Sequence, residues 1–193
     1  DDRDEDEDDD GLTEAQEEDI YGTDPMKNDT DGDGLSDGVE IVGGTDPKES
    51  DSDQDGLTDG QEIAAGTNPL SPDTDSDGLT DLVEIDRGTD PKDSDSDDDG
   101  LTDSVETGTG TYVSVSDTGT DPNDPDTDDD GLGDAVETAT GIVLSEVNTG
   151  TDPNSADSDK DGLNDKDEID FGIDPNHPDT DRDGLNDSVE TNK

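Results

Sequence analysis

The sequence predicts a mostly irregular, loop-rich array of short repeats, elongated as a rod or solenoid, without a single hydrophobic core. Three observations favour this class. A twelve-residue acidic motif recurs eight times in 193 residues, each copy carries only a few small apolar side chains, and Gly-Thr-Asp-Pro or a close variant lies between copies. Repeats that contact only their neighbours build linear arrays of this kind.

The eight copies form one array over residues 1–193. In the stretch DTDGDGLSDGVE, residues 29–40, acidic residues occupy positions 1, 3, 5, 9 and 12, with Gly at position 6 and Leu at position 7. All copies keep this pattern, except that Glu14 replaces Asp at position 9 of the first. The copies occupy residues 6–17, 29–40, 51–62, 73–84, 95–106, 126–137, 157–168 and 179–190.

The composition is that of a chain that needs cations in order to fold. The formal net charge is −55, with 20% hydrophobic and 2% aromatic residues. Such a chain repels itself and has little apolar surface to bury, so it stays disordered or binds cations. The acidic balance excludes nucleic acid and anionic membranes as partners, and no apolar run is long enough for membrane insertion. The chain starts with Asp1 rather than Met, which we interpret as a processed product or a fragment.

Enzymatic activity is not expected from this sequence. It offers no Ser-His or Cys-His arrangement, since cysteine is absent and the single histidine has no suitable neighbours, and it has no basic phosphate-binding loop. Its 64 acidic residues make close carboxylate pairs inevitable, so such pairs do not indicate glycoside hydrolysis.

The spacing of the acidic positions is that of an EF-hand calcium loop. Calcium takes about six to eight oxygen ligands, and such a loop offers alternate carboxylates, a backbone carbonyl at position 7 and a bidentate Glu at position 12. The Gly at position 6 permits the turn that returns the later ligands to the same ion. We therefore predict at least one Ca²⁺ per loop, about eight in all. The Asp-x-x-Glu spacing of positions 9 and 12 also fits a helix capping box, and the two roles are compatible.

The predicted ligands are the residues at positions 1, 3, 5, 7, 9 and 12 of every copy. They are Asp6, Asp8, Asp10, Leu12, Glu14 and Glu17; Asp29, Asp31, Asp33, Leu35, Asp37 and Glu40; Asp51, Asp53, Asp55, Leu57, Asp59 and Glu62; Asp73, Asp75, Asp77, Leu79, Asp81 and Glu84; Asp95, Asp97, Asp99, Leu101, Asp103 and Glu106; Asp126, Asp128, Asp130, Leu132, Asp134 and Glu137; Asp157, Asp159, Asp161, Leu163, Asp165 and Glu168; Asp179, Asp181, Asp183, Leu185, Asp187 and Glu190.

A helix of one to two turns is expected after each loop. In the fourth copy, Leu79, Val83 and Ile85 can gather on one side of such a helix. Gly88 is expected to end it in a left-handed conformation, and Pro91 prevents its continuation. Because so short a helix is unstable alone, its apolar residues must be shared with a neighbouring copy.

At these residues the chain resembles the thrombospondin type 3 repeat in its bacterial form. The Asp-x-Asp-x-Asp-Gly-Leu-x-Asp-x-x-Glu loop followed by Gly-Thr-Asp-Pro matches that pattern over nearly the whole chain. The resemblance implies a calcium-wrapped, loop-rich rod in an extracellular or cell-surface protein. The lack of cysteine and the terminal Glu of each loop depart from the animal form. Dockerins and paired EF-hands are less similar, since the first have two repeats with longer apolar helices and the second an amphipathic entering helix.

Two insertions break the regular spacing, at about residues 107–118 and 138–149 in the fifth and sixth repeats. Their β-branched runs, Tyr112 to Ser116 and Ile142 to Val147, predict small β insertions. Three roles remain open for these runs. Each could cover an adjacent helix, the two could pair with each other, or they could pair with another chain.

These features favour a structural role outside the cell. The leading interpretation is a calcium-rigidified rod that serves as a cell-surface stalk or as a self-assembling filament subunit. The alternatives are a spacer segment of a larger adhesin and a calcium buffer. Affinity separates them, because a rod in a calcium-rich exterior needs a Kd of only about 10⁻⁴–10⁻³ M, whereas a buffer binds far more tightly.

Overall fold

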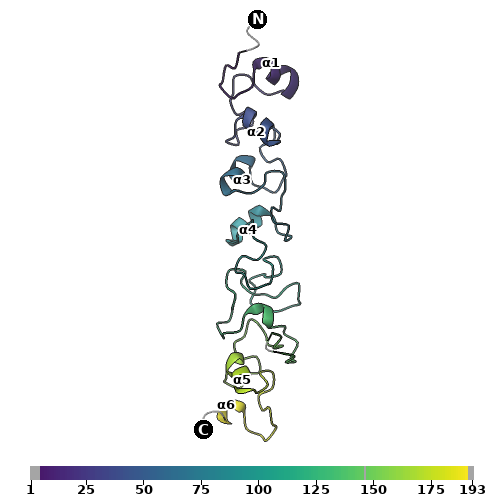
Figure 1. Cartoon of the computed structure of the whole chain (residues 1–193), viewed down its shortest axis with the longest axis vertical. Coiled ribbons are helices and arrows are strands. Elements are labelled where there is room, and N and C mark those ends of the chain that lie inside the picture. Colours follow the sequence, from purple (N-terminus) through teal and green to yellow (C-terminus); the bar gives the residue numbers. More distant parts are fainter. Residues whose placement is uncertain (1–4, 146, 191–193) are drawn as a thin grey trace. The chain divides into compact units, whose positions relative to one another are not determined.

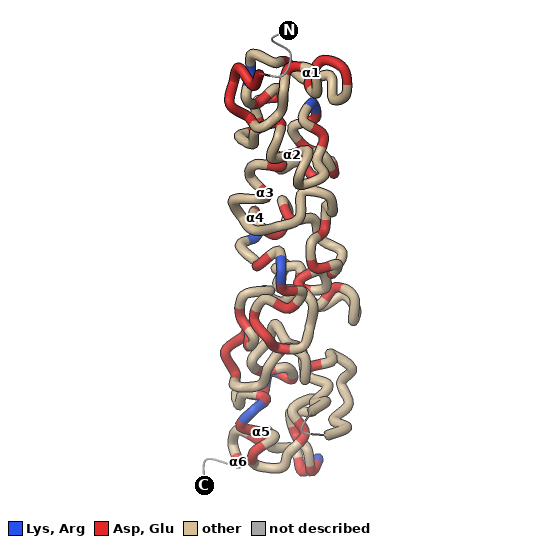
Figure 2. The backbone as a smooth tube through the Cα atoms, turned by 45° about the horizontal axis from the view of Figure 1, so that its top comes forward, with Lys and Arg blue, Asp and Glu red and all other residues tan. Residues whose placement is uncertain are grey.

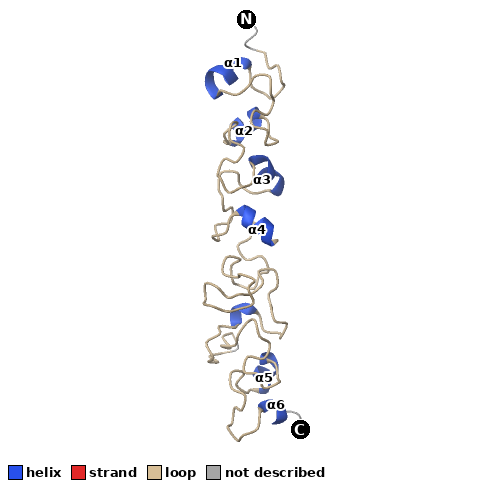
Figure 3. Ribbon diagram, turned by 180° about the vertical axis from the view of Figure 1, so that it is seen from behind, coloured by secondary structure: helices blue, strands red, loops and turns tan. Residues whose placement is uncertain are grey.

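The computed structural model describes residues 5–145 and 147–190, and the chain divides into two compact units, Asp1–Lys92 and Asp93–Lys193. The first unit holds copies one to four and the second holds copies five to eight (Figure 1). Loops and turns make up most of each unit, and the described residues contain no strand (Figure 3). The loop-rich repeat class predicted from the sequence is confirmed.

Short helices follow the loops of the first unit. In copies two to four they begin at position 9 and end at a glycine with positive φ, such as Gly88 (φ 85°), as predicted. The amide of that glycine donates to the carbonyl of the Glu at position 12, which closes the last turn. The helices are α1 (Glu14–Gln16), the π-helix η2 (Glu17–Tyr21), α2 (Asp37–Gly43), α3 (Asp59–Ala65) and α4 (Asp81–Arg87).

The second unit has shorter helices where the insertions occur. Copy six forms only a 3₁₀ turn, and copy five forms turns without a helix at residues 103–105, so the expected helix is wrong there. The cause is the insertion that begins directly after position 12. The amide of Gly108 donates to the carbonyl of Thr120 at 2.8 Å, which diverts the backbone from a helical path. The helices are η3 (Asp134–Val136), α5 (Asp165–Phe171) and α6 (Asp187–Glu190).

The predicted β insertions are wrong as strands in the described residues. Each run turns back on itself and leaves a single isolated bridge, Ser114 with Asp117 and Ser145 with Asn148. The amide of Asp117 donates to the carbonyl of Ser114 at 2.9 Å, so the chain reverses before a ladder can form. Glu146, within the second run, lies outside the described residues.

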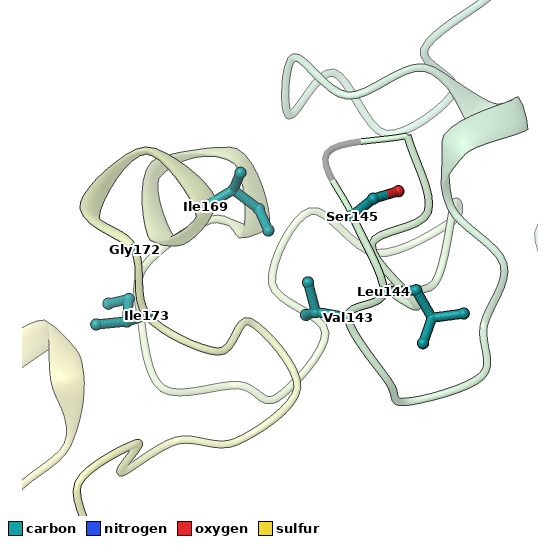
Figure 4. Close-up of a pocket in the computed structure, with 6 residues that line it drawn as sticks. All are labelled: Val143, Leu144, Ser145, Ile169, Gly172 and Ile173. Carbon is teal, nitrogen blue, oxygen red and sulfur yellow. The ribbon is translucent and has the colours of Figure 1, made fainter.

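The second insertion lies beside α5. A shallow apolar pocket is lined by Val143, Leu144 and Ser145 from the insertion and by Ile169, Gly172 and Ile173 from α5 and the residues after it. Figure 4 shows Val143 on the side of the insertion nearest α5, with Leu144 directed away from the helix. This placement fits the covering role better than pairing between the two insertions.

Buried side chains are mainly acidic residues and threonines. In the described chain the buried apolar residues are three leucines, Leu12, Leu57 and Leu132, and five prolines of the segments between loops, Pro47, Pro91, Pro122, Pro153 and Pro175. Val83 and Ile85, which were expected to gather against a neighbour, are 37% and 43% exposed. Acidic residues recur along both units (Figure 2). So small an apolar core supplies little folding free energy, and the interior of each copy is polar. None of the helices in the described residues is long and apolar enough to span a bilayer.

Candidate metal centres

Each loop is shaped by backbone amides that donate to the loop's own carboxylates. In the second copy, Asp29 accepts from Gly32 through one oxygen (2.6 Å) and from Gly34 through the other (3.1 Å). Both glycines have positive φ, 86° and 106°. Other copies keep the positive φ at position 4 with non-glycine residues such as Gln54 (φ 67°). The turn is therefore a property of the loop and does not depend on glycine at position 4.

The same hydrogen bonds bring the first three carboxylates together. Asp31 accepts from the amide of Asp33 at 3.2 Å, and Asp33 accepts from the amide of Leu35 at 2.7 Å. Oxygens of Asp29, Asp31 and Asp33 then lie within 4.8 Å of one another. We call the carboxylates at positions 1, 3 and 5 of one copy the loop group. The first and third copies form the same group from Asp6, Asp8 and Asp10 and from Asp51, Asp53 and Asp55.

The Asp at position 5 also reaches the next copy. Its second oxygen accepts a hydrogen bond from the backbone amide at position 10 of the following loop, as Asp33 does from Gly60 at 2.7 Å. The bond therefore ties the loop to the start of the next helix. The six such bonds within the two units join Gly38 to Asp10, Gly60 to Asp33, Leu82 to Asp55, Ala135 to Asp99, Lys166 to Asp130 and Ser188 to Asp161.

A second set of carboxylates meets at these connections. Oxygens of Asp33, Glu40 and Asp59 lie within 4.8 Å of one another, although Asp59 belongs to the following copy. The set Asp10, Glu17 and Asp37 repeats the arrangement one copy earlier, with all three residues buried. We call the carboxylates at positions 5 and 12 of one copy and position 9 of the next the junction group.

The electrostatics of the junction group show mutual repulsion. Burial, as the largest cause, and the neighbouring carboxylates Asp31, Asp33, Asp37 and Asp59 together raise the pKa of Glu40 to about 8. Burial likewise raises the pKa of Glu168 to about 9. At each junction within a unit, the Asp at position 9 of the next copy is among the charges that raise the pKa of the Glu. The pairs are Asp37 and Glu17, Asp59 and Glu40, Asp81 and Glu62, Asp134 and Glu106, Asp165 and Glu137, and Asp187 and Glu168.

The residues present fit a hard divalent cation. Glu62 and Glu168 are fully buried, and within the described residues neither oxygen of either side chain has a hydrogen-bond partner. A second oxygen of the position-3 carboxylates Asp31, Asp53 and Asp159 is also buried without a partner there. Buried, unpaired carboxylates are strongly destabilising unless a cation compensates them. An all-oxygen set of this kind suits calcium, which accepts six to eight oxygen ligands in variable geometry.

The predicted ligands of one loop therefore take part in two overlapping groups. Positions 1, 3 and 5 lie together in the loop group, and position 12 lies with position 5 and with position 9 of the next copy in the junction group. Position 3 also lies near position 12, since Asp31 is the first of the charges that raise the pKa of Glu40 after burial. The amide of the Leu at position 7 donates to the position-5 carboxylate, as in Leu35 and Asp33. Coordination by the Leu carbonyls remains a prediction from the loop register.

Two hydroxyl positions outside the predicted ligands also contact the carboxylates. The Ser or Thr at position 2 donates to the Asp at position 9, as Ser52 does to Asp59 at 2.7 Å. The Thr of Gly-Thr-Asp-Pro lies beside the Glu at position 12, as Thr23 does beside Glu17, with 3.3 Å between hydroxyl and carboxylate oxygens. The sequence carried a signal for the first position, because seven of the eight copies have Ser or Thr there.

Comparison with known families supports the calcium interpretation. The family model described as the bacterial TSP3 repeat matches residues 6–28, 29–49, 51–72, 73–94, 145–156 and 157–178. No curated protein and no solved structure gives a significant match. The matched segments cover more than half of the chain and carry the acidic loops that form both groups. The chain is therefore a calcium-binding repeat protein that belongs to the bacterial TSP3 repeat family.

Proposed function

We propose that this chain is a calcium-rigidified structural segment of an extracellular or cell-surface protein, with calcium in the junction groups as well as in the loop groups. The observation that carries the proposal is the buried Glu at position 12, which faces an Asp of the next copy at each connection within a unit. Glu40 and Asp59 illustrate it, since both are 0% exposed and share a group with Asp33. An ion bound there holds ligands from two copies at once.

Such an ion would supply the attraction that the packing lacks. The chain carries a formal charge of −55, and the only buried apolar side chains among its described residues are three leucines and five prolines. Calcium binding to the folded form adds its binding free energy to the stability of the fold. Because each junction ion bridges neighbouring copies, saturation would also fix the angle between them. This is the basis for expecting a stalk or spacer, and we expect no enzymatic activity.

Ion counting tests the two-group arrangement. Equilibrium dialysis against millimolar calcium, followed by metal analysis, should find clearly more than eight ions per chain, toward two per repeat. Glu40→Gln should lose one ion, whereas the matched variant Glu49→Gln, at an exposed position outside the loops, should lose none. A count of eight or fewer, or an unchanged count in Glu40→Gln, would contradict calcium at the junctions.

The calcium affinity of the sites and the cellular location of the chain test whether it acts outside the cell. A structural role outside the cell is expected to work with sites of about 10⁻⁴–10⁻³ M, whereas micromolar binding would favour a calcium buffer. Antibody labelling of intact native cells should detect the chain at the surface. Labelling only after the cells are permeabilised would contradict the extracellular setting.

Self-association into a filament is a second candidate, and the insertions favour it. Val113, Val115, Leu144 and Val147 are 67–76% exposed, on a chain whose other surfaces are strongly acidic. Calcium would lower the repulsion between chains and allow these apolar residues to meet. Sedimentation in calcium should then show assemblies that dissolve with chelator and are lost in Val115→Lys with Leu144→Lys. A wild-type chain that stays monomeric at high concentration would leave the spacer role alone, such as a segment of a larger adhesin.

A further inference from the structure

A hydroxyl at position 2 contacts the position-9 carboxylate of the same loop in copies two to eight. In the third copy, Ser52 donates twice to Asp59: its amide to Oδ1 at 2.8 Å and its hydroxyl to Oδ2 at 2.7 Å. The equivalent hydroxyl contacts are made by Thr30, Thr74, Ser96, Thr127, Ser158 and Thr180. Both oxygens of the position-9 carboxylate are thus held from within its own loop.

The direction of the hydroxyl proton is fixed by a third group. The amide of Asp46, in the preceding Gly-Thr-Asp-Pro segment, donates to the oxygen of Ser52 at 3.1 Å. A hydroxyl has one proton to donate, and this contact uses an acceptor lone pair of the oxygen, so the proton points to Asp59. The chain of donors runs from the Asp46 amide through the Ser52 hydroxyl to the Asp59 carboxylate.

The held carboxylate keeps free acceptor positions on the side of the preceding copy. An ionised carboxylate has about four lone-pair sites, and Ser52 takes one on each oxygen of Asp59. Asp59 is 0% exposed and groups with Asp33 and Glu40 of the preceding copy. A hydrogen bond to the side of a ligand that faces away from the metal determines the orientation of the ligand and strengthens metal binding.

We propose that the hydroxyl at position 2 is a positioning residue for the calcium ion of the junction group, because it holds the position-9 Asp toward the preceding copy. This inference rests on the proposed function. The repeats themselves supply a comparison, since the first copy has Glu7 at position 2 and Glu14 at position 9, so that both positions differ together. Ser or Thr at position 2 accompanies Asp at position 9 in all other copies.

The test removes one hydroxyl and measures calcium dependence near the affected junction. In the full chain, hydrogen exchange of peptides covering residues 33–62 is followed over a calcium series, and the calcium concentration at half-protection is recorded. Ser52→Ala should raise this concentration about tenfold or more, as is usual for groups that orient metal ligands. Ser52→Thr, which keeps the hydroxyl, should stay near the wild type.

The matched control is Ser36→Ala. Ser36 precedes α2 and its side chain makes no capping hydrogen bond to that helix, so the same atom is lost without a ligand contact. A shift in Ser36→Ala as large as that in Ser52→Ala would overturn the inference, and so would a failure of Ser52→Thr to restore the wild-type value.

A double variant separates positioning from a general effect on folding. If Ser52 acts through the junction ion, Ser52→Ala should add almost nothing once Glu40→Gln has removed that ion. Additive shifts would mean that Ser52 stabilises the loop independently, and they would overturn the inference while leaving the proposed function intact. If Glu40→Gln alone left the calcium concentration at half-protection unchanged, no ion would bind at the junction, and both proposals would fail.

Discussion

Glu40→Gln should change stability in opposite directions with and without calcium. The side chain is fully buried, one of its oxygens has no partner among the described residues, and it groups with Asp33 and Asp59. In calcium, the substitution removes a charged ligand and leaves a buried amide in its place. Breaking one partner of a buried charge interaction costs about 3–5 kcal/mol, which corresponds to roughly a hundredfold or greater loss of affinity at that site.

Without metal, the same substitution should stabilise the folded arrangement. Burial and neighbouring carboxylates raise the pKa of Glu40 from 4.5 to about 8. At a pH above both values, that shift opposes the charged form by at most about 5 kcal/mol, and solvent near the loop lowers this, so we expect about 1–3 kcal/mol. Glutamine carries no charge and escapes this repulsion.

The assay compares wild type and Glu40→Gln by circular dichroism at pH 8.5. In calcium, urea unfolding gives the loss of stability; in metal-free solution, a titration with trimethylamine N-oxide gives the concentration needed to fold the chain. Glu49→Gln is the control for the removal of one exposed negative charge. A loss of stability in both conditions would refute the reasoning, because a group with a purely structural role has no reason to reverse its effect.

Stripping the metal at neutral pH should convert the circular dichroism spectrum to that of a coil, and retained native signal would mean that packing suffices without calcium. The metal-free chain should be more compact by light scattering at pH 5 than at pH 8. Because the pKa values of Glu40 and Glu168 are raised to about 8 and about 9, the unfolded chain binds fewer protons between pH 4.5 and 9, and stability is lost as the pH rises through that range; equal radii would contradict this. Gly44→Ala should destabilise the calcium-bound chain by about 1 kcal/mol, since Gly44 ends α2 at φ 94°, whereas Gly43→Ala, which meets no atom within 4 Å, should leave it unchanged or more stable in thermal melts.

The sequence predicted the local structure of the repeats well, because that structure depends on short-range chemistry. The Asp-x-Asp-x-Asp-Gly register determines which amides donate to which carboxylates within about five residues, and the glycine after each regular helix can adopt the left-handed conformation that ends it. The prediction of strands from the β-branched runs was wrong because it, too, relied on local sequence alone. Their composition favours strands, but the turn at Ser114 to Asp117 reverses the chain before a partner strand is available.

The junction group, which combines carboxylates of two copies, could not be predicted from one loop. In an EF-hand register, position 9 points back to its own ion, and nothing within residues 51–62 distinguishes that arrangement from the observed one. The difference arises from residue 33, whose second oxygen accepts from Gly60 and brings the next loop against Glu40. This contact spans 27 residues and depends on how the copies stack, so it is visible only when the fold is known.

The shared Asp at position 5 links the chemistry of one copy to the geometry of the next. One oxygen of Asp33 accepts from Leu35 and helps to close its own loop, while the other accepts from Gly60 at the start of α3. An ion bound in the second loop would therefore also fix the carboxylate that accepts the hydrogen bond from the third copy. Within each unit, we expect ordering of one loop to order the following copy through this residue. The apolar contacts between copies are too few to transmit that ordering by themselves. A chain built in this way can have a defined structure with almost no hydrophobic core, and we expect that structure to require calcium.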